Sequence, residues 1–445
     1  MKIMNIQTIV AVSALFMAMS ADGHQKDTQS IDINSSIGKA DSIVCRVSGT
    51  ITDRPQTTSV FIIEAEKDFR IHSGYTVPVI DGKFNLTLMD RQPLAYEVIF
   101  YDELEKGSWQ NRIFFSGDGD VELVYNNSNE PGKDKVISQL QDNILAEKFS
   151  EMDKERFNAK RELLYANLHS LHENGKAYTP EFQNLLDQLD TTPKVESRDS
   201  IRELVSRMNK GPKERRYTKE YLAYHTELNR LYSQADSLKR SFISQNPSIY
   251  GLYSIKYAFL LAGSRHDWID LPAYIDIFER YYKEQMSDHP YTEEIQGLID
   301  ARQMKVGNRY PDYKVTREDG STERIASLIK GNTAVIDLWA SWCGPCRKHS
   351  KELIPLYEKY KDKGFKVIAV ARESDDCTAM NEAMKKDGYP WESFVDINDR
   401  DNVWRINQAG NGGGKIILVD SDGTIIGTDI PTEEIKEFLI NTYGE

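Results

Sequence analysis

A Trp-Cys-Gly-Pro-Cys motif at residues 342–346 constrains this chain more than any other feature. It follows an apolar run at residues 334–340 and precedes a helical pattern from Arg347 to Lys363, so it lies where a buried strand gives way to a helix. A helix N-terminus offers unpaired N–H groups and a partial positive charge, which favour a cysteine thiolate. Two cysteines three residues apart at such a junction can also form a small reversible disulfide. The motif therefore predicts thiol–disulfide chemistry.

The two cysteines suggest different roles. Cys343 is the candidate nucleophile, because it would be exposed at the start of the helix, where such sites bring a thiol pKa to about 3.5–7.5. Cys346 lies one helical turn further and is the candidate resolving thiol, which would attack the mixed disulfide and release the reduced substrate. Gly344 and Pro345 would shape the turn between them, and Trp342 would limit the access of water.

A metal site is the alternative interpretation of the cysteine pair. A structural zinc ion usually needs four ligands, and the chain has no second CxxC sequence to go with His349 or Cys377. A c-type haem would need histidine directly after Cys346, where Arg347 stands. We therefore expect no metal and no cofactor beyond the Cys343–Cys346 disulfide itself.

Length and composition indicate a multidomain, soluble protein. A chain of 445 residues predicts about three domains. Its net charge of −13 argues against nucleic-acid binding, which needs a basic surface. Four cysteines are too few for a disulfide-stapled scaffold, so Cys45 and Cys377 are expected to be unpaired and buried.

The N-terminus has the pattern of a secretory signal. Lys2 precedes an apolar stretch at residues 9–19, and Ala18 and Ser20 are small residues suited to cleavage after Ser20. The stretch is short for a bilayer-spanning helix, although a retained membrane anchor is the alternative. We expect a signal peptide over residues 1–20, a polar leader over 21–40, and export from the cytoplasm.

Three patterns follow the leader and predict a multidomain fold. Residues 41–130 contain short alternating runs separated by glycine-containing turns, which predict an antiparallel, β-sandwich-like module. Residues 131–305 are poor in glycine and proline and have helical periodicity, which predicts a helical region of four to six helices. Residues 306–445 alternate strand and helix and end in a hairpin, which predicts a compact α/β domain. The strands of the first module are expected at residues 43–47, 59–63, 76–80, 84–89, 95–101, 113–115 and 121–125.

The C-terminal region resembles a known superfamily. Residues 337–346, Asp-Leu-Trp-Ala-Ser-Trp-Cys-Gly-Pro-Cys, closely resemble the active-site strand and loop of thioredoxins. The lead-in Tyr310-Pro311-Asp312-Tyr313 and residues 356–365 resemble the exported TlpA/ResA-type branch, and the likeness spans residues 306–445. The region before it more weakly resembles Bacteroidetes proteins that carry a β domain of unassigned function ahead of such a domain.

This resemblance implies an enzyme, a protein-disulfide reductase or thiol–disulfide interchange oxidoreductase of the periplasm or cell envelope. Its substrates would be proteins or small molecules with thiols or disulfides, and its electron donor would be membrane-bound. The alternative is a binding or interaction protein of the envelope in which the thioredoxin-like domain is degenerate or regulatory.

Two further positions bear on the chemistry. In thioredoxins an acidic residue at the position of Asp337 assists proton transfer from the resolving cysteine, and a carboxyl within an apolar strand should have a raised pKa. The alternative for Asp337 is a solvent-exposed strand end. The family also has a cis-proline facing the two cysteines, and the corresponding position, counted back from Asp420, is Gly414. The resemblance thus implies a substrate groove that is altered at Gly414.

Overall fold

A computed structural model of the protein describes residues 42–126, 134–192, 195–263 and 266–445. The expected signal peptide and polar leader lie outside these residues. The chain divides into two compact units. The first unit contains the chain up to Asp53 together with Thr87–Pro93 and Gly117–Gln285, and the second contains Arg54–Leu86, Leu94–Ser116 and Met286–Glu445.

Two four-stranded sheets form from the N-terminal part of the described chain. One has the order β4-β1-β7-β8 and the other β3-β2-β5-β6. Each predicted strand is present. The strands could be predicted because alternation of buried and exposed side chains is a local signal, as in β1, where Cys45, Val47 and Ile51 are buried. The strands are β1 (Ile43–Ile51), β2 (Ser59–Glu64), β3 (Tyr75–Pro78), β4 (Lys83–Asp90), β5 (Ala95–Phe100), β6 (Ile113–Phe115), β7 (Gly119–Tyr125) and β8 (Lys135–Ser138).

Four of the strand pairs in these sheets are antiparallel, and the pair of β1 with β7 is parallel. β2 pairs antiparallel with β3 and β5, β5 with β6, and β7 with β8. β1 runs parallel to β7, with Cys45 opposite Gly119 and Ile51 opposite Tyr125. β8 lies in a range where helix was expected, and it extends the sheet along β7. A short helix, α1 (Tyr101–Leu104), follows β5.

The middle of the chain is helical, as predicted. Its described residues form α2 (Gln141–Asp153), α3 (Ala159–Glu173), α4 (Pro180–Thr191), α5 (Val195–Lys210), α6 (Lys219–Gln245), α7 (Ile249–Gly263), α8 (Leu271–Tyr281) and α9 (Pro290–Ala301). These are more helices than the four to six expected. Threonine or aspartate caps begin three of them, at Thr179, Thr218 and Asp270. Leucines at helical spacing on α3 and α6 form the seam between those two helices.

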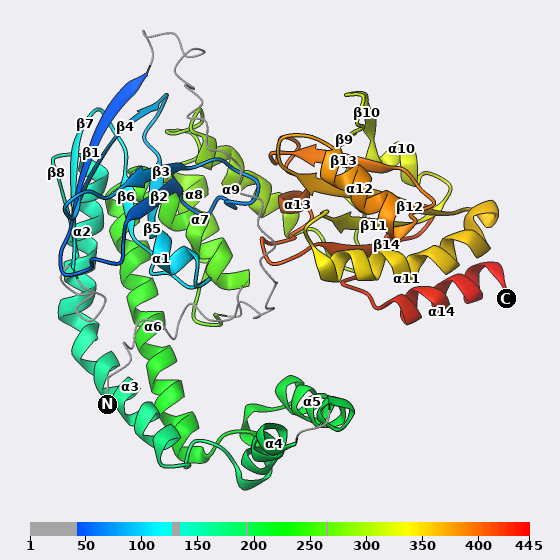
Figure 1. The fold of residues 1–445 in the computed structure, drawn as a ribbon, viewed down its shortest axis with the longest axis horizontal. Helices are drawn as coiled ribbons and strands as arrows, with labels where there is room; N and C mark the ends of the chain where they lie inside the picture. Colours follow the sequence, from blue (N-terminus) through cyan, green and yellow to red (C-terminus); the bar gives the residue numbers. More distant parts are fainter. Residues whose placement is uncertain (1–41, 127–133, 193–194, 264–265) are drawn as a thin grey trace. The chain divides into compact units, whose positions relative to one another are not determined.

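The C-terminal domain is a five-stranded α/β fold, which confirms the predicted thioredoxin-like class. Its strand order is β13-β12-β11-β14-β15, with β11 at the centre. β11 runs parallel to β12 and antiparallel to β14. Helices α11 and α14 lie side by side on one face of the sheet, and α12 covers the other (Figure 1). The elements are β9 (Lys314–Thr316), β10 (Thr322–Arg324), α10 (Ile325–Ile329), β11 (Thr333–Trp339), α11 (Gly344–Tyr360), β12 (Phe365–Glu373), α12 (Thr378–Asp387), β13 (Ser393–Ile397), α13 (Val403–Ile406), β14 (Lys415–Val419), β15 (Ile425–Thr428) and α14 (Thr432–Tyr443).

The helices given above lie within residues 42–126, 134–192, 195–263 and 266–445. Within those ranges, no helix combines the length and the apolar character that crossing a bilayer requires.

Candidate functional site

The two cysteines of the motif lie at the junction between β11 and α11. Cys343 is the N-cap of α11, and its Sγ accepts a hydrogen bond from the backbone N–H of Cys346 at 3.3 Å. The two residues are joined by a disulfide, with their Cα atoms 5.3 Å apart. Gly344 and Pro345 form the exposed tip of the turn, and Pro345 lies in the first turn of the helix, where its missing N–H costs nothing.

Cys343 is more enclosed than the sequence suggested. Its exposed fraction is 6%, close to the 7% of Cys346, because both side chains belong to the apolar core of the domain. Both border a cavity of about 350 Å³.

The cavity has charged walls as well as the disulfide. Asp337, His349, Glu352, Lys415 and Asp429 contribute to its lining, together with the glycine loop that ends at Gly414. The Nζ of Lys415 lies 3.8 Å from an Oδ of Asp429, so these two opposite charges form an ion pair in the cavity wall. The volume is at the lower end of the range for ligand pockets.

Gly414 lies directly against the disulfide. Its backbone N–H donates to Cys346 Sγ at 3.1 Å. A Cβ at this position would come within 1.7 Å of the Leu338 carbonyl oxygen, so the close approach of the two backbones requires glycine. The structure thus places Gly414 at the cysteine pair, where the resemblance locates a proline.

Asp337 is buried at the centre of the sheet. Its exposed fraction is 1%, so it is not the solvent-exposed strand end that was the alternative. Burial raises the pKa of its carboxyl to about 7, while a hydrogen bond donated by Ser350 Oγ to Oδ2 at 2.6 Å acts in the opposite direction. A carboxyl with this pKa can exchange a proton near neutral pH.

Sequence reasoning missed two polar groups around the motif. Ser350 follows Cys346 by four residues on α11, and this spacing could have placed it on the same helix face. Glu373 ends β12 and accepts hydrogen bonds from the N–H and the hydroxyl of Ser341, at 2.6 and 2.7 Å. Burial raises the pKa of Glu373. These bonds hold the loop that leads into Cys343, and no local sequence signal indicates them, because they depend on the pairing of β11 with β12.

Trp342 packs between two side chains beside the motif. The guanidinium of Arg70 lies 4.0 Å from the centroid of its ring, and the ring of Trp404 lies 6.1 Å away, centroid to centroid. The sequence alone indicated no partner for Trp342. Arg70 comes from the loop between β2 and β3, far away in the sequence but in the same compact unit.

The remaining cysteines take no part in the site. Cys45 and Cys377 are unpaired, as expected, but Cys377 is only partly buried at the start of α12. Burial raises the pKa of both thiols. Across the part of the chain that the structure describes, no three His, Cys, Asp or Glu side chains are arranged to hold a metal ion.

Known proteins match the C-terminal domain. The Redoxin family model matches residues 305–438. The chain is 33% identical over 143 residues to thiol-disulfide oxidoreductase ResA of Bacillus thuringiensis and to ResA of Bacillus anthracis, and each match covers 32% of this chain and 79% of the relative. The thioredoxin domain of a thiol-disulfide oxidoreductase from Bacteroides vulgatus is 23% identical, with 30% of this chain and 97% of that chain covered and a TM-score of 0.28.

The sequence likeness to the Bacillus proteins spans most of their length, and the range matched by the Redoxin family model includes the cysteine pair with its preceding strand. It agrees with the five-stranded α/β domain and with the disulfide at the start of α11. Through this domain, the chain belongs to the ResA-like thiol–disulfide oxidoreductases of the thioredoxin superfamily.

Proposed function

We propose that this oxidoreductase is an exported enzyme that reduces or exchanges protein disulfides through Cys343 and Cys346. The observation that supports this most directly is the disulfide at the N-terminus of α11, which borders a cavity shared with the buried carboxyl of Asp337. The helix N-terminus favours negative charge on Cys343, and the cavity gives a substrate access to it.

The proposed reaction begins with the reduced enzyme. The Cys343 thiolate attacks one sulfur of a substrate disulfide, which forms a mixed disulfide and releases the other substrate sulfur as a thiolate that takes up a proton. Cys346 then attacks Cys343 Sγ, which breaks the mixed disulfide, releases the second substrate thiol and leaves the Cys343–Cys346 disulfide. Two electrons pass to the substrate, and a dithiol donor must return them in a second exchange.

Asp337 is the proposed proton acceptor for the second step. The Cys346 thiol must lose its proton before it can attack, and Asp337 and Cys346 line the same cavity. A pKa of about 7 lets the carboxyl take that proton and return it within one cycle near neutral pH. Ser350 holds the carboxyl in place from α11.

The proposed setting is the periplasm or cell envelope, with a membrane-bound electron donor. The apolar stretch at residues 9–19 with its preceding lysine supports export. Cell fractionation, with sequencing of the mature N-terminus, tests this part: retention in the cytoplasm with an intact N-terminus would contradict it.

Cysteine variants test the chemistry. Cys343→Ser should abolish the reduction of insulin disulfides by dithiothreitol-charged protein, whereas Cys346→Ser should accumulate a mixed disulfide with its substrate on non-reducing gels. Cys377→Ser is the matched control, because this free cysteine lies outside the motif. Undiminished insulin reduction by Cys343→Ser would refute the proposed role.

The direction of the reaction follows from the reduction potential of the couple. Equilibration in defined thiol buffers, followed by alkylation of free thiols, measures it. A reductase should have a potential below about −200 mV, the range of reducing thioredoxin-like proteins. A higher value would make the protein a disulfide donor.

A further inference from the structure

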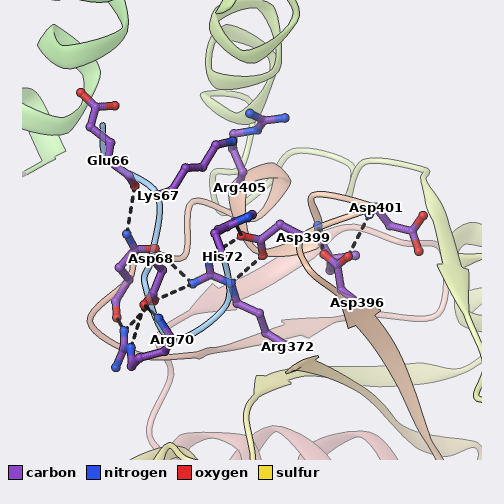
Figure 2. A network of polar contacts seen from close by, with 12 residues as sticks. Glu66, Lys67, Asp68, Arg70, His72, Arg372, Asp396, Asp399, Asp401 and Arg405 are labelled. Atoms are coloured by element: carbon purple, nitrogen blue, oxygen red, sulfur yellow. Dashed lines mark hydrogen bonds and ion pairs between the residues drawn. The ribbon is translucent and has the colours of Figure 1, made fainter. Parts of the chain in front are cut away.

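A loop outside the α/β fold lies against the redox site. It connects β2 to β3 over residues 65–74 and belongs to the same compact unit as the C-terminal domain. Figure 2 shows how its side chains meet those of the C-terminal domain. The network centres on Arg372, near the end of β12, which lies between two carboxylates. Its guanidinium is 2.5 Å from Asp399 and 3.4 Å from Asp68 of the loop.

These charges are buried, so the contact is specific. The exposed fractions of the Asp68 and Arg372 side chains are 2% and 5%. Asp68 also accepts two hydrogen bonds from the side chain of Arg70, at 2.7 and 2.9 Å, and Asp399 lies 2.8 Å from His72. A buried ion pair requires good geometry and additional hydrogen bonds to offset its desolvation, and this network supplies both.

One end of the network reaches the residue before Cys343. Asp68 fixes Arg70, and the guanidinium of Arg70 covers one face of the Trp342 ring. Trp404 lies beside the same ring, and Arg372 stands over Trp404 at 5.0 Å. Trp342 is therefore held by groups that the network orients, and its backbone leads directly into the nucleophile.

The other end reaches the glycine loop that contacts Cys346. Four of residues 410–414 are glycines, so Asn411 carries the only side chain by which this segment can be held. Arg372 donates to Asn411 Oδ1 at 3.1 Å, and Asn411 Nδ2 donates to the backbone oxygen of Glu66 at 3.4 Å. Arg70 also donates to the Asn411 backbone oxygen. Glycine-rich backbone has high conformational entropy, so these bonds restrict a segment that would otherwise move.

We propose that the β2–β3 loop positions both sides of the Cys343–Cys346 couple, with Asp68, Arg372 and Asn411 as positioning residues for the oxidoreductase reaction. The inference rests on the proposed function of the two cysteines. Its chemical consequence runs through Gly414, whose N–H donates to Cys346 Sγ. A hydrogen bond to a thiolate is stronger than one to a disulfide sulfur. A fixed Gly414 therefore favours loss of the Cys346 proton in the reduced couple, and this ionisation favours the reduced form.

Two variants and a matched control test the positioning role in the full-length protein. Asp68→Asn removes the carboxylate charge by which the loop contacts Arg372. Asn411→Ala removes the side chain of an exposed residue, so we expect the protein to fold as the parent does. Asp312→Asn is the control, because it also breaks an aspartate–arginine contact, 2.6 Å to Arg324, but does not line the cavity.

The readout is the glutathione redox equilibrium of Cys343 and Cys346. Releasing the glycine loop should make both test variants harder to reduce, with a shift of about tenfold in the equilibrium constant, or about 30 mV for this two-electron couple. The double variant should shift the equilibrium no further than the larger single shift, because both changes release the same glycine loop and both side chains contact Arg372. The control should match the parent.

The outcomes separate this inference from the proposed function. Parent-like equilibria in Asn411→Ala and Asp68→Asn, in a protein that reduces insulin, would overturn the positioning role alone. If Asp68→Asn does not fold, Asn411→Ala decides the question by itself. An inactive parent protein would overturn the proposed function instead.

Discussion

The buried carboxyl of Asp337 should make the stability of the C-terminal domain depend on pH, and Asp337→Asn should remove that dependence. Its pKa is raised from an ordinary 3.8 to about 7 by burial. The folded state therefore binds a proton more tightly than the unfolded state, so the free energy of unfolding falls as the pH rises from about 4 to about 7 and changes little above that. A difference of about 3 pKa units corresponds to about 4 kcal/mol.

Asparagine keeps the shape of the protonated carboxyl and can still accept the hydrogen bond from Ser350. The variant and the parent should thus be nearly equal in stability at about pH 4, and the variant should be more stable by up to about 4 kcal/mol at about pH 8. The gain should reach most of its final value by about pH 7, since the parent carboxyl is half ionised there.

Urea unfolding of the oxidised proteins, followed by tryptophan fluorescence, measures this difference at about pH 4, 6 and 8. The signal reports mainly on the relevant domain, because four of the six tryptophans lie in it: Trp339, Trp342, Trp391 and Trp404. A stability difference that is independent of pH would refute the argument, because it would mean that Asp337 titrates as an ordinary carboxyl.

The same variant should lose activity while it gains stability. General acid–base groups contribute about 100-fold or more to rates, so the turnover number of Asp337→Asn in insulin reduction should fall by about that factor near neutral pH. The block should come at the attack by Cys346, and the mixed disulfide on Cys343 should accumulate. Parent-like turnover would exclude Asp337 as the proton acceptor.

Two further predictions concern the neighbours of the cysteines. Gly414→Ala should lower the free energy of unfolding by about 1–3 kcal/mol, because its Cβ would meet the Leu338 oxygen; Gly413→Ala, whose Cβ meets no atom within 4 Å, is the control, and equal urea midpoints for the two would contradict the packing argument. Ser350→Ala removes the bond that lowers the pKa of Asp337, so the pH at which stability stops falling should move upward, with an added cost of about 1 kcal/mol where the carboxyl is ionised. The same urea series measures this effect, and an unchanged pH profile would argue against it.

The elements of the fold followed from local patterns, but their pairing did not. A strand such as β1 is visible in the sequence because its side chains alternate between the core and the solvent. The parallel pairing of β1 with β7 joins residues more than 70 positions apart, and no local pattern specifies it. The short β8 strand has too few residues for a recognisable period, so its range looked like the start of the helical region.

The site divides in the same way. The cysteine pair and Asp337 lie on one continuous strand–loop–helix segment, so their proximity follows from the chain order. Glu373 reaches that segment through the register of β12 on β11, and Arg70 reaches it from a loop about 270 residues earlier in the sequence. Contacts of this kind depend on tertiary structure, so no local pattern in the sequence indicates them.

Gly414 shows why a departure from a family pattern needs the structure for its interpretation. The absence of proline suggested an altered substrate groove. A proline has no backbone N–H, whereas Gly414 donates its N–H to Cys346 Sγ. The approach of Leu338 leaves no room for any side chain at this position. Glycine therefore adds a hydrogen bond that stabilises negative charge on the resolving sulfur. The glycines also make the backbone of residues 410–414 more flexible, which explains why Asn411 must be held by Arg372 and the β2–β3 loop.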